Sequence, residues 1–136
     1  MSSKPLIRVR DVMKHEFDLV EGMATVAKAL ETMQHVETKT LIVKPRDEND
    51  EIGIVALSDI SREVLAKDRA PDRVNIYEIM VKPAFSVHPD MDIRYCARLF
   101  DRFHLSRAPV VKDREVLGIV SLTDLVLKGL LSGHRK

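Results

Sequence analysis

The chain carries one short pattern twice. Residues 53–60 read GIVALSDI, and residues 118–125 read GIVSLTDL. In each copy a β-branched run leads directly into a Ser/Thr-Asp pair that is typical of a helix start. An internal repeat of this kind predicts two similar halves, and it directs the search for a functional site to the region between them.

The repeat extends well beyond this pattern. Val12-Met13 matches Ile79-Met80 at an offset of 67 residues, whereas the two copies of the pattern are 65 residues apart. The difference falls in the polar segment 44–51, where a surface hairpin would absorb an insertion. Repeats of about 60 residues are too small to be confidently independent, so we expect one domain with a shared core. The expected boundaries are a first repeat over 1–66, a linker over 67–74 and a second repeat over 75–136.

Hydrophobic periodicity gives both halves the same order of elements, β-α-β-β-α. Side chains able to cap a helix precede each expected longer helix, namely Thr25, Ser58, Asp92 and Thr123. Short strands joined to covering helices predict an α/β (α+β) fold with mixed sheets. The expected strands are 17–20, 41–43 and 52–56 in the first half, and 85–87, 108–111 and 116–121 in the second.

Composition excludes several classes of function. The 22 Lys and Arg residues nearly balance the 21 Asp and Glu residues, which argues against nucleic acid as a partner. No apolar run approaches the length of a membrane span, and the N-terminal residues do not resemble a signal peptide. Cys96 is the only cysteine, so an intramolecular disulfide is impossible and a reducing cytoplasm fits.

No set of residues suggests catalysis. The five histidines show neither the i, i+4 spacing nor the HExxH motif of a metal site, and the five glycines form no phosphate-binding loop. Cys96 lies on the inward stripe of its expected helix, as a buried structural thiol would. We therefore expect a protein that is not an enzyme, with no metal and no required cofactor.

Two helices of the second half carry more apolar residues than one buried face needs. In the helix 93–103, Tyr95, Leu99 and Phe103 widen the apolar arc, and the last helix is apolar almost all round. We expect a homodimer contact to cover the second side of the helix 93–103. The alternative is packing under the linker or the C-terminal tail. Gly129 within the last helix suggests a close approach of another helix.

Asp59 and Asp124 follow the two copies of the β-branched run. An acid in the first turn of a helix complements the helix dipole, which is a purely structural role. A ligand is the alternative, because helix N-termini suit phosphates and a carboxylate suits the hydroxyls of a ribose. Ser121 would add a hydroxyl at the same strand end. A nucleotide would fit this combination.

The doubled unit resembles a CBS-domain pair (the regulatory module first described in cystathionine β-synthase). The matching pieces are VRDVM and IYEIM at the openings, LSRAPVV before the hairpin and GIVSLTDL at the close. The resemblance covers nearly the whole chain and implies a stand-alone pair whose repeats pack about a pseudo-twofold axis. It also implies a cleft between the repeats that binds an adenosine nucleotide such as AMP, ADP, ATP or NAD and signals to an effector protein in trans.

The resemblance also implies which residues bind the nucleotide. The family's closing motif supplies a Ser or Thr for phosphate and an Asp for ribose, and Ser121 and Asp124 match it in full. The first half keeps Asp59 but has Ala56 in place of the hydroxyl. One good site and one weak or empty site are therefore expected.

Residues before the second strand of each half complete the predicted sites. Thr38 and Lys39 are expected to face Ser121 and Asp124, whereas Leu105 and Ser106 are expected to face Asp59. Lys39 and Arg107 are the candidates for phosphate contacts. The alternative function is a scaffold that dimerises or binds a protein partner without a small-molecule ligand.

Overall fold

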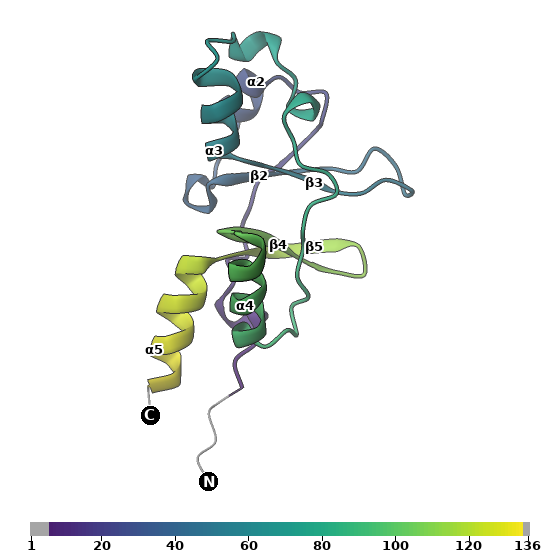
Figure 1. Cartoon of the computed structure of the whole chain (residues 1–136). Coiled ribbons are helices and arrows are strands. Elements are labelled where there is room, and N and C mark those ends of the chain that lie inside the picture. The colour runs from purple at the N-terminus through teal and green to yellow at the C-terminus, as the bar shows by residue number, and fades with distance from the viewer. Residues whose placement is uncertain (1–5, 135–136) are drawn as a thin grey trace. The chain divides into compact units, whose positions relative to one another are not determined.

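A computed structural model describes residues 6–134, which form two compact units (Figure 1). Unit 2 is one stretch of chain, residues 17–84. Unit 1 combines residues 6–16 with residues 85–134. The opening segment of each repeat therefore belongs to the unit built mostly from the other repeat. No helix in the described part of the chain is long and apolar enough to cross a membrane.

Unit 2 contains a three-stranded sheet in the order β1-β2-β3. Its β1 is parallel to β2, and β2 is antiparallel to β3. Helices α2 and α3 lie on the same side of this sheet (Figure 1). The elements are β1 (Leu19–Val20), α2 (Val26–Glu31), η1 (Val36–Thr38), β2 (Thr40–Val43), β3 (Gly53–Ala56), α3 (Leu57–Ile60), its π-helical continuation η2 (Ser61–Leu65), η3 (Pro71–Arg73) and η4 (Ile76–Glu78).

Unit 1 contains the second hairpin, in which β4 pairs antiparallel with β5. Asp113 and Arg114 form the predicted turn, both with positive φ, as a two-residue hairpin turn requires. The strand predicted at 85–87 is reduced to one parallel bridge between Val87 and Val110. The elements are α1 (Val9–Val12), α4 (Ile93–Phe103), β4 (Arg107–Lys112), β5 (Glu115–Ser121), η5 (Asp124–Lys128) and α5 (Gly129–His134).

Each unit has its own apolar core. In unit 2, Leu41 and Val55 of the sheet pack with Val26 of α2 and with Ile76 from the opening segment of the second repeat. In unit 1 the corresponding cluster includes Val9 and Val12 of α1, together with Cys96 and Phe100 of α4. The amphipathic opening segment thus supplies core side chains to the unit of the other repeat.

Helix starts follow the prediction at two of four places. Thr25 accepts a hydrogen bond from the Lys28 amide at 3.1 Å, and Asp92 caps α4 as expected. Ser58 and Thr123 lie inside helices instead. The Asp59 carboxylate accepts from the Ala56 amide at 2.8 Å.

The glycine of the repeated pattern allows a strand-like contact with the opening segment. A Cβ on Gly118 would lie 2.2 Å from the carbonyl oxygen of Lys14. Lys14 and Ile119 exchange two backbone hydrogen bonds, of 2.8 and 2.9 Å. Ile54 and Val81 form the same pair in unit 2, at 3.0 and 2.9 Å. In both units, therefore, the residue after the Met of the opening motif pairs with the Ile of the GIV repeat.

Candidate functional site

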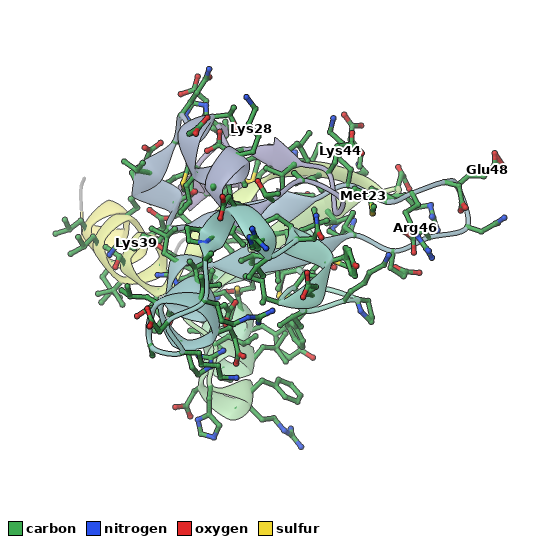
Figure 2. All side chains as sticks on the ribbon, turned by 90° about the horizontal axis from the view of Figure 1, so that it is seen from above. Met23, Lys28, Lys39, Lys44, Arg46 and Glu48 are labelled. Atoms are coloured by element: carbon green, nitrogen blue, oxygen red, sulfur yellow. The ribbon has the colours of Figure 1, made fainter. Side chains whose placement is uncertain are left out.

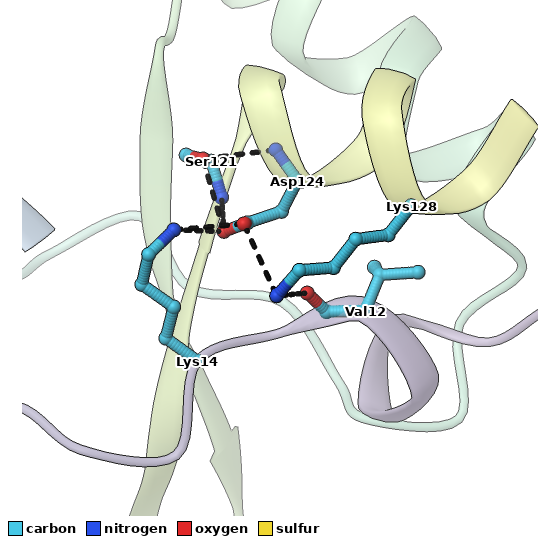
Figure 3. A network of polar contacts seen from close by, with 5 residues as sticks. All are labelled: Val12, Lys14, Ser121, Asp124 and Lys128. Atoms are coloured by element: carbon cyan, nitrogen blue, oxygen red, sulfur yellow. Dashed lines mark hydrogen bonds and ion pairs between the residues drawn. The ribbon is translucent and has the colours of Figure 1, made fainter. Parts of the chain in front are cut away.

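The second copy of the closing motif brings Ser121 and Asp124 together at a helix start (Figure 3). A continuous helix from residue 122 to residue 134 follows the last residue of β5. The Ser121 hydroxyl donates to Oδ2 of Asp124 at 3.0 Å and accepts from the Asp124 amide at 3.1 Å. Ser121, and not Thr123, therefore caps this helix, and Asp124 is buried against it.

Two lysines hold the Asp124 carboxylate. Lys14 Nζ lies 2.7 and 2.9 Å from its two oxygens, and Lys128 Nζ lies 3.5 Å from Oδ1 (Figure 3). Lys128 also donates to the carbonyl oxygen of Val12 at 3.3 Å. Burial raises the pKa of Asp124, but hydrogen bonds from Lys14 and Ser121 and the nearby lysine charges lower it more, so the pKa lies below its ordinary value.

This arrangement has a net positive charge and a fully occupied carboxylate. Two ammonium groups surround one carboxylate whose side chain is only 4% exposed. Its oxygens already accept from Lys14, from the Ser121 hydroxyl and from the Ser121 amide at 3.2 Å. Another hydrogen-bond donor would therefore compete with these groups for Asp124, and an anion beside the site would attract the Lys14 ammonium.

The first copy of the motif builds a different site in unit 2. Oδ1 of Asp59 lies 2.7 Å from Nη2 of Arg62, in the next turn of the same helix. The offset of 65 places Glu63 where the second repeat has Lys128, and the offset of 67 places Val81 where the first repeat has Lys14. The first copy therefore lacks the hydroxyl and both lysines, which is a larger difference than Ala56 alone suggests.

Thr38 and Lys39, predicted to bind the nucleotide, lie just before β2. The Thr38 hydroxyl is engaged within its own loop, since it donates to the His35 carbonyl at 2.9 Å. Lys39 is exposed and adopts a left-handed backbone with φ 60°. Its carbonyl accepts from the Leu57 amide at 2.9 Å, which places it beside the helix start of Asp59. Its approach to Ser121 and Asp124 stays a prediction.

The corresponding segment of unit 1, just before and at the start of β4, contains Leu105, Ser106 and Arg107. The Ser106 carbonyl accepts from the Leu122 amide at 2.8 Å, so Ser106 lies at the helix start that contains Asp124. Arg107 pairs with Ser121 across the β4–β5 hairpin, and its Nε is buried without a hydrogen-bond partner. Leu105 and Ser106 also line a cavity of about 310 Å³. Their approach to Asp59 stays a prediction.

Sequence reasoning missed both lysines of the site. Lys128 follows Asp124 by four residues on one helix, and the i, i+4 rule could have identified it. Lys14 lies 110 residues from Asp124 in the chain, and its counterpart in the second repeat is Val81. Only the pairing of Lys14 with Ile119 across β5 reveals this contact.

The Cys96 thiol and the metal-binding side chain types were the other sequence candidates for chemistry. Burial raises the pKa of the Cys96 thiol to about 11, so it is a poor nucleophile at neutral pH. Within residues 6–134, no group of three or more His, Cys, Asp or Glu side chains could hold a metal ion.

The sequence of this chain matches a known family. The CBS domain model matches residues 9–66 and 76–129. An uncharacterized protein of Methanopyrus kandleri is 29% identical over 113 residues, which are 80% of this chain and 57% of that protein. The chain thus spans less than two thirds of that relative's length.

Solved structures agree with the family match. The hexameric CBS-CP12 protein from bloom-forming cyanobacteria is 35% identical, with a TM-score of 0.88, over 96% of this chain and 76% of that one. The CBS domain pair of protein MJ0100, solved with 5′-methylthioadenosine and S-adenosyl-L-methionine, shares the fold at 24% identity and a TM-score of 0.75, over 96% of this chain and 100% of that one. The chain belongs to the CBS-domain family, with two CBS domains in tandem.

Proposed function

We propose that the chain is a regulatory module that binds an adenosine nucleotide at the Ser121–Asp124 helix start. The observation that carries this proposal is the pairing of a hydroxyl with a buried carboxylate, 3.0 Å apart, at the end of a strand. The ribose hydroxyls would bind Asp124, and the phosphate would attract Lys14 and Lys128. The protein MJ0100 pair, a relative of the same fold, was solved with adenosyl ligands, which supports an adenosyl group.

The charge of the site favours a phosphate-bearing ligand. Two ammonium groups face one carboxylate, so an incoming anion is attracted and a cation is repelled. AMP, ADP, ATP and NAD meet this requirement, whereas the sulfonium group of S-adenosylmethionine does not. We therefore expect this chain to prefer phosphorylated adenosine over the ligands of protein MJ0100.

Thermal unfolding with each candidate ligand tests this proposal. A ligand present at about 100 times its dissociation constant adds about 2.7 kcal/mol to the native state. AMP, ADP, ATP or NAD should raise Tm by several degrees, and S-adenosylmethionine should raise it less. Asp124→Asn should abolish the shift, whereas Asp59→Asn serves as the matched control and should retain it. An absence of any shift in the folded protein would refute nucleotide binding.

Exposed apolar side chains favour a second function, a scaffold that dimerises. Tyr95 and Phe103 of α4 are about half exposed, and Phe103 contacts the ring of Phe85 at a centroid distance of 5.2 Å. The last helix adds a further exposed set, consisting of Val126, Leu127, Leu130 and Leu131. A homodimer would cover such side chains, and the hexameric CBS-CP12 relative shows that one member of this family oligomerises.

Sedimentation velocity separates the two functions. The scaffold proposal expects a dimer at micromolar concentration without ligand, and Leu127→Glu with Leu130→Glu should convert it to a monomer. The reverse result, a monomer in the unmodified protein, would contradict it. A nucleotide-induced Tm shift in a protein that stays monomeric would leave the sensor proposal standing alone.

A further inference from the structure

Unit 2 contains a cavity at the opposite end of β2 from Lys39. Its volume is about 460 Å³, within the usual range for small-molecule sites. Figure 2 shows Met23, Lys44 and Arg46 gathered near the base of the β2–β3 hairpin, away from Lys39. The lining residues come from the loop after β1, the end of β2, the hairpin and the opening segment of the second repeat, namely Glu21, Gly22, Met23, Val43, Lys44, Arg46, Tyr77, Met80 and Lys82.

One part of the cavity is apolar. Val43 is buried beneath it, and Tyr77 is half exposed beside it. Gly22 also lines this part, and an added Cβ would lie 3.6 Å from Cβ of Tyr77 and 3.7 Å from Cγ1 of Val43, which is ordinary van der Waals contact. We expect a larger side chain at position 22 to occupy part of the cavity. A planar apolar group fits against a tyrosine ring of this kind.

The other part of the cavity is cationic. Lys82 Nζ and Arg46 Nε share the Asp50 carboxylate, at 2.6 and 3.1 Å. The Asp50 pKa is held well below its ordinary value by hydrogen bonds from Lys82 and Arg46, so this carboxylate is ionised at neutral pH. Lys44 has a weaker contact, 3.4 Å to the exposed Glu21. Three cations and the Glu21 carboxylate thus line this part of the cavity, while Asp50 holds two of those cations and Asp47 also acts on Arg46.

The equivalent place in unit 1 is built differently. At the offset of 67, Pro89 replaces Gly22, Arg10 replaces Tyr77 and Val111 replaces Lys44. Arg10 forms an ion pair with Asp90 there. The backbone is nonetheless the same, since the Arg10 amide donates to the Pro89 carbonyl at 2.9 Å just as Tyr77 does to Gly22. A cavity with cations and an aromatic ring in its lining is therefore particular to unit 2. The backbone that the two units share does not require it.

We propose that this cavity binds an aromatic phosphate monoester, with the phosphate on Lys44 and Arg46 and the ring against Tyr77 and Met80. A phosphate offers three oxygens and up to two negative charges to cations arranged on one side. Arg46 and Lys82 keep part of their donor capacity for it, because a guanidinium has five N–H groups and an ammonium has three. This site is separate from the Ser121–Asp124 helix start, which lies in unit 1.

Amide chemical shifts of the ¹⁵N-labelled protein test this inference, with phenyl phosphate as the probe. Phenyl phosphate should cause saturable shifts at Gly22, Lys44 and Tyr77. Gly22→Leu should abolish them by filling the apolar part. Lys44→Met should weaken binding about fivefold, the upper end of what an exposed ion pair contributes. Lys28→Met, which removes an exposed lysine of α2, is the matched control and should have no effect.

Two further probes make the result decisive. Inorganic phosphate and phenol, each at the same concentration, should shift these amides far less, because each has only one half of the ligand. Equal shifts with inorganic phosphate would show simple charge attraction and overturn the proposal, as would saturable shifts found only outside this cavity, or none at all. Amide shifts at Ser121 and Asp124 report any binding at the helix start of unit 1 separately, so failure here and failure of the nucleotide proposal are distinguishable.

Discussion

Replacing Lys14 by methionine removes one charge from the Asp124 site and keeps most of the side-chain length. Asp124 loses its contacts of 2.7 and 2.9 Å and retains Ser121 and the more distant Lys128. Breaking a buried ion pair costs about 3–5 kcal/mol, whereas an exposed pair contributes about 0.2–1 kcal/mol. Asp124 is buried but Lys14 is 27% exposed, and two partners remain. We expect the free energy of unfolding to fall by about 2 kcal/mol at pH 7.

The cost of Lys14→Met should depend on pH with a definite sign. The folded-state pKa of Asp124 lies below its ordinary value because hydrogen bonds from Lys14 and Ser121 outweigh the effect of burial. A carboxyl of this kind stabilises the fold above its unfolded pKa, near 3.9, and loses that contribution as the pH falls through the folded pKa. Without Lys14, the pKa of Asp124 in the folded protein rises. The cost is therefore greatest at neutral pH and shrinks below about pH 4.

Urea unfolding followed by circular dichroism at pH 7 and pH 3 measures both effects. Lys28→Met, on the exposed face of α2, controls for loss of a surface lysine and should change the free energy of unfolding by less than about 0.5 kcal/mol. A double-mutant cycle with Asp124→Asn should give a coupling energy above about 1 kcal/mol. The reasoning fails if Lys14→Met costs nothing at pH 7, or if its cost is the same at both pH values.

Three other variants or treatments have definite expected outcomes. Gly118→Ala should lower the free energy of unfolding by about 1–3 kcal/mol in urea, because its Cβ would lie 2.2 Å from the Lys14 carbonyl and backbone must move. Gly129→Ala should cost far less in the same assay, since its 2.5 Å neighbour is the mobile end of Ile93 and alanine favours the helix by about 1 kcal/mol. The Cys96 thiol, with its pKa raised to about 11, should react with Ellman's reagent at pH 8 only after urea unfolds the protein, and rapid reaction without urea would contradict its burial.

Local patterns predicted the elements of this fold because their signals are contained within a few residues. The alternation of apolar runs and turn residues located both hairpins, and the two-residue turn at Asp113 and Arg114 has the expected positive φ. A Cβ added at Gly129 would lie 2.5 Å from Cδ1 of Ile93 in α4, and the close approach of another helix stays a prediction. Thr25 and Asp92 act as caps because a side-chain oxygen directly before a helix can accept from an amide of its first turn.

Local patterns did not predict which distant segments meet. The two incorrect caps, Ser58 and Thr123, have a local cause, because the helices begin earlier than expected, at residues 57 and 122. The Asp124 site depends on Lys14, which reaches it only because an edge of β5 accepts the opening segment beside Gly118. The spacing of Lys14 and Asp124 in the sequence does not predict that pairing. The role of Asp124 was therefore inferred without Lys14, the cation that contacts it most closely.

Because the opening segment of each repeat packs in the unit of the other repeat, cleavage between the repeats affects both units. A proteolytic cut within residues 67–74 would give two fragments, each missing the opening segment, with its β-bridge and core side chains, that the other retains. Such fragments should complement each other when mixed, although neither would fold well alone. A single ancestral repeat could meet the same need by swapping its first residues with a second copy.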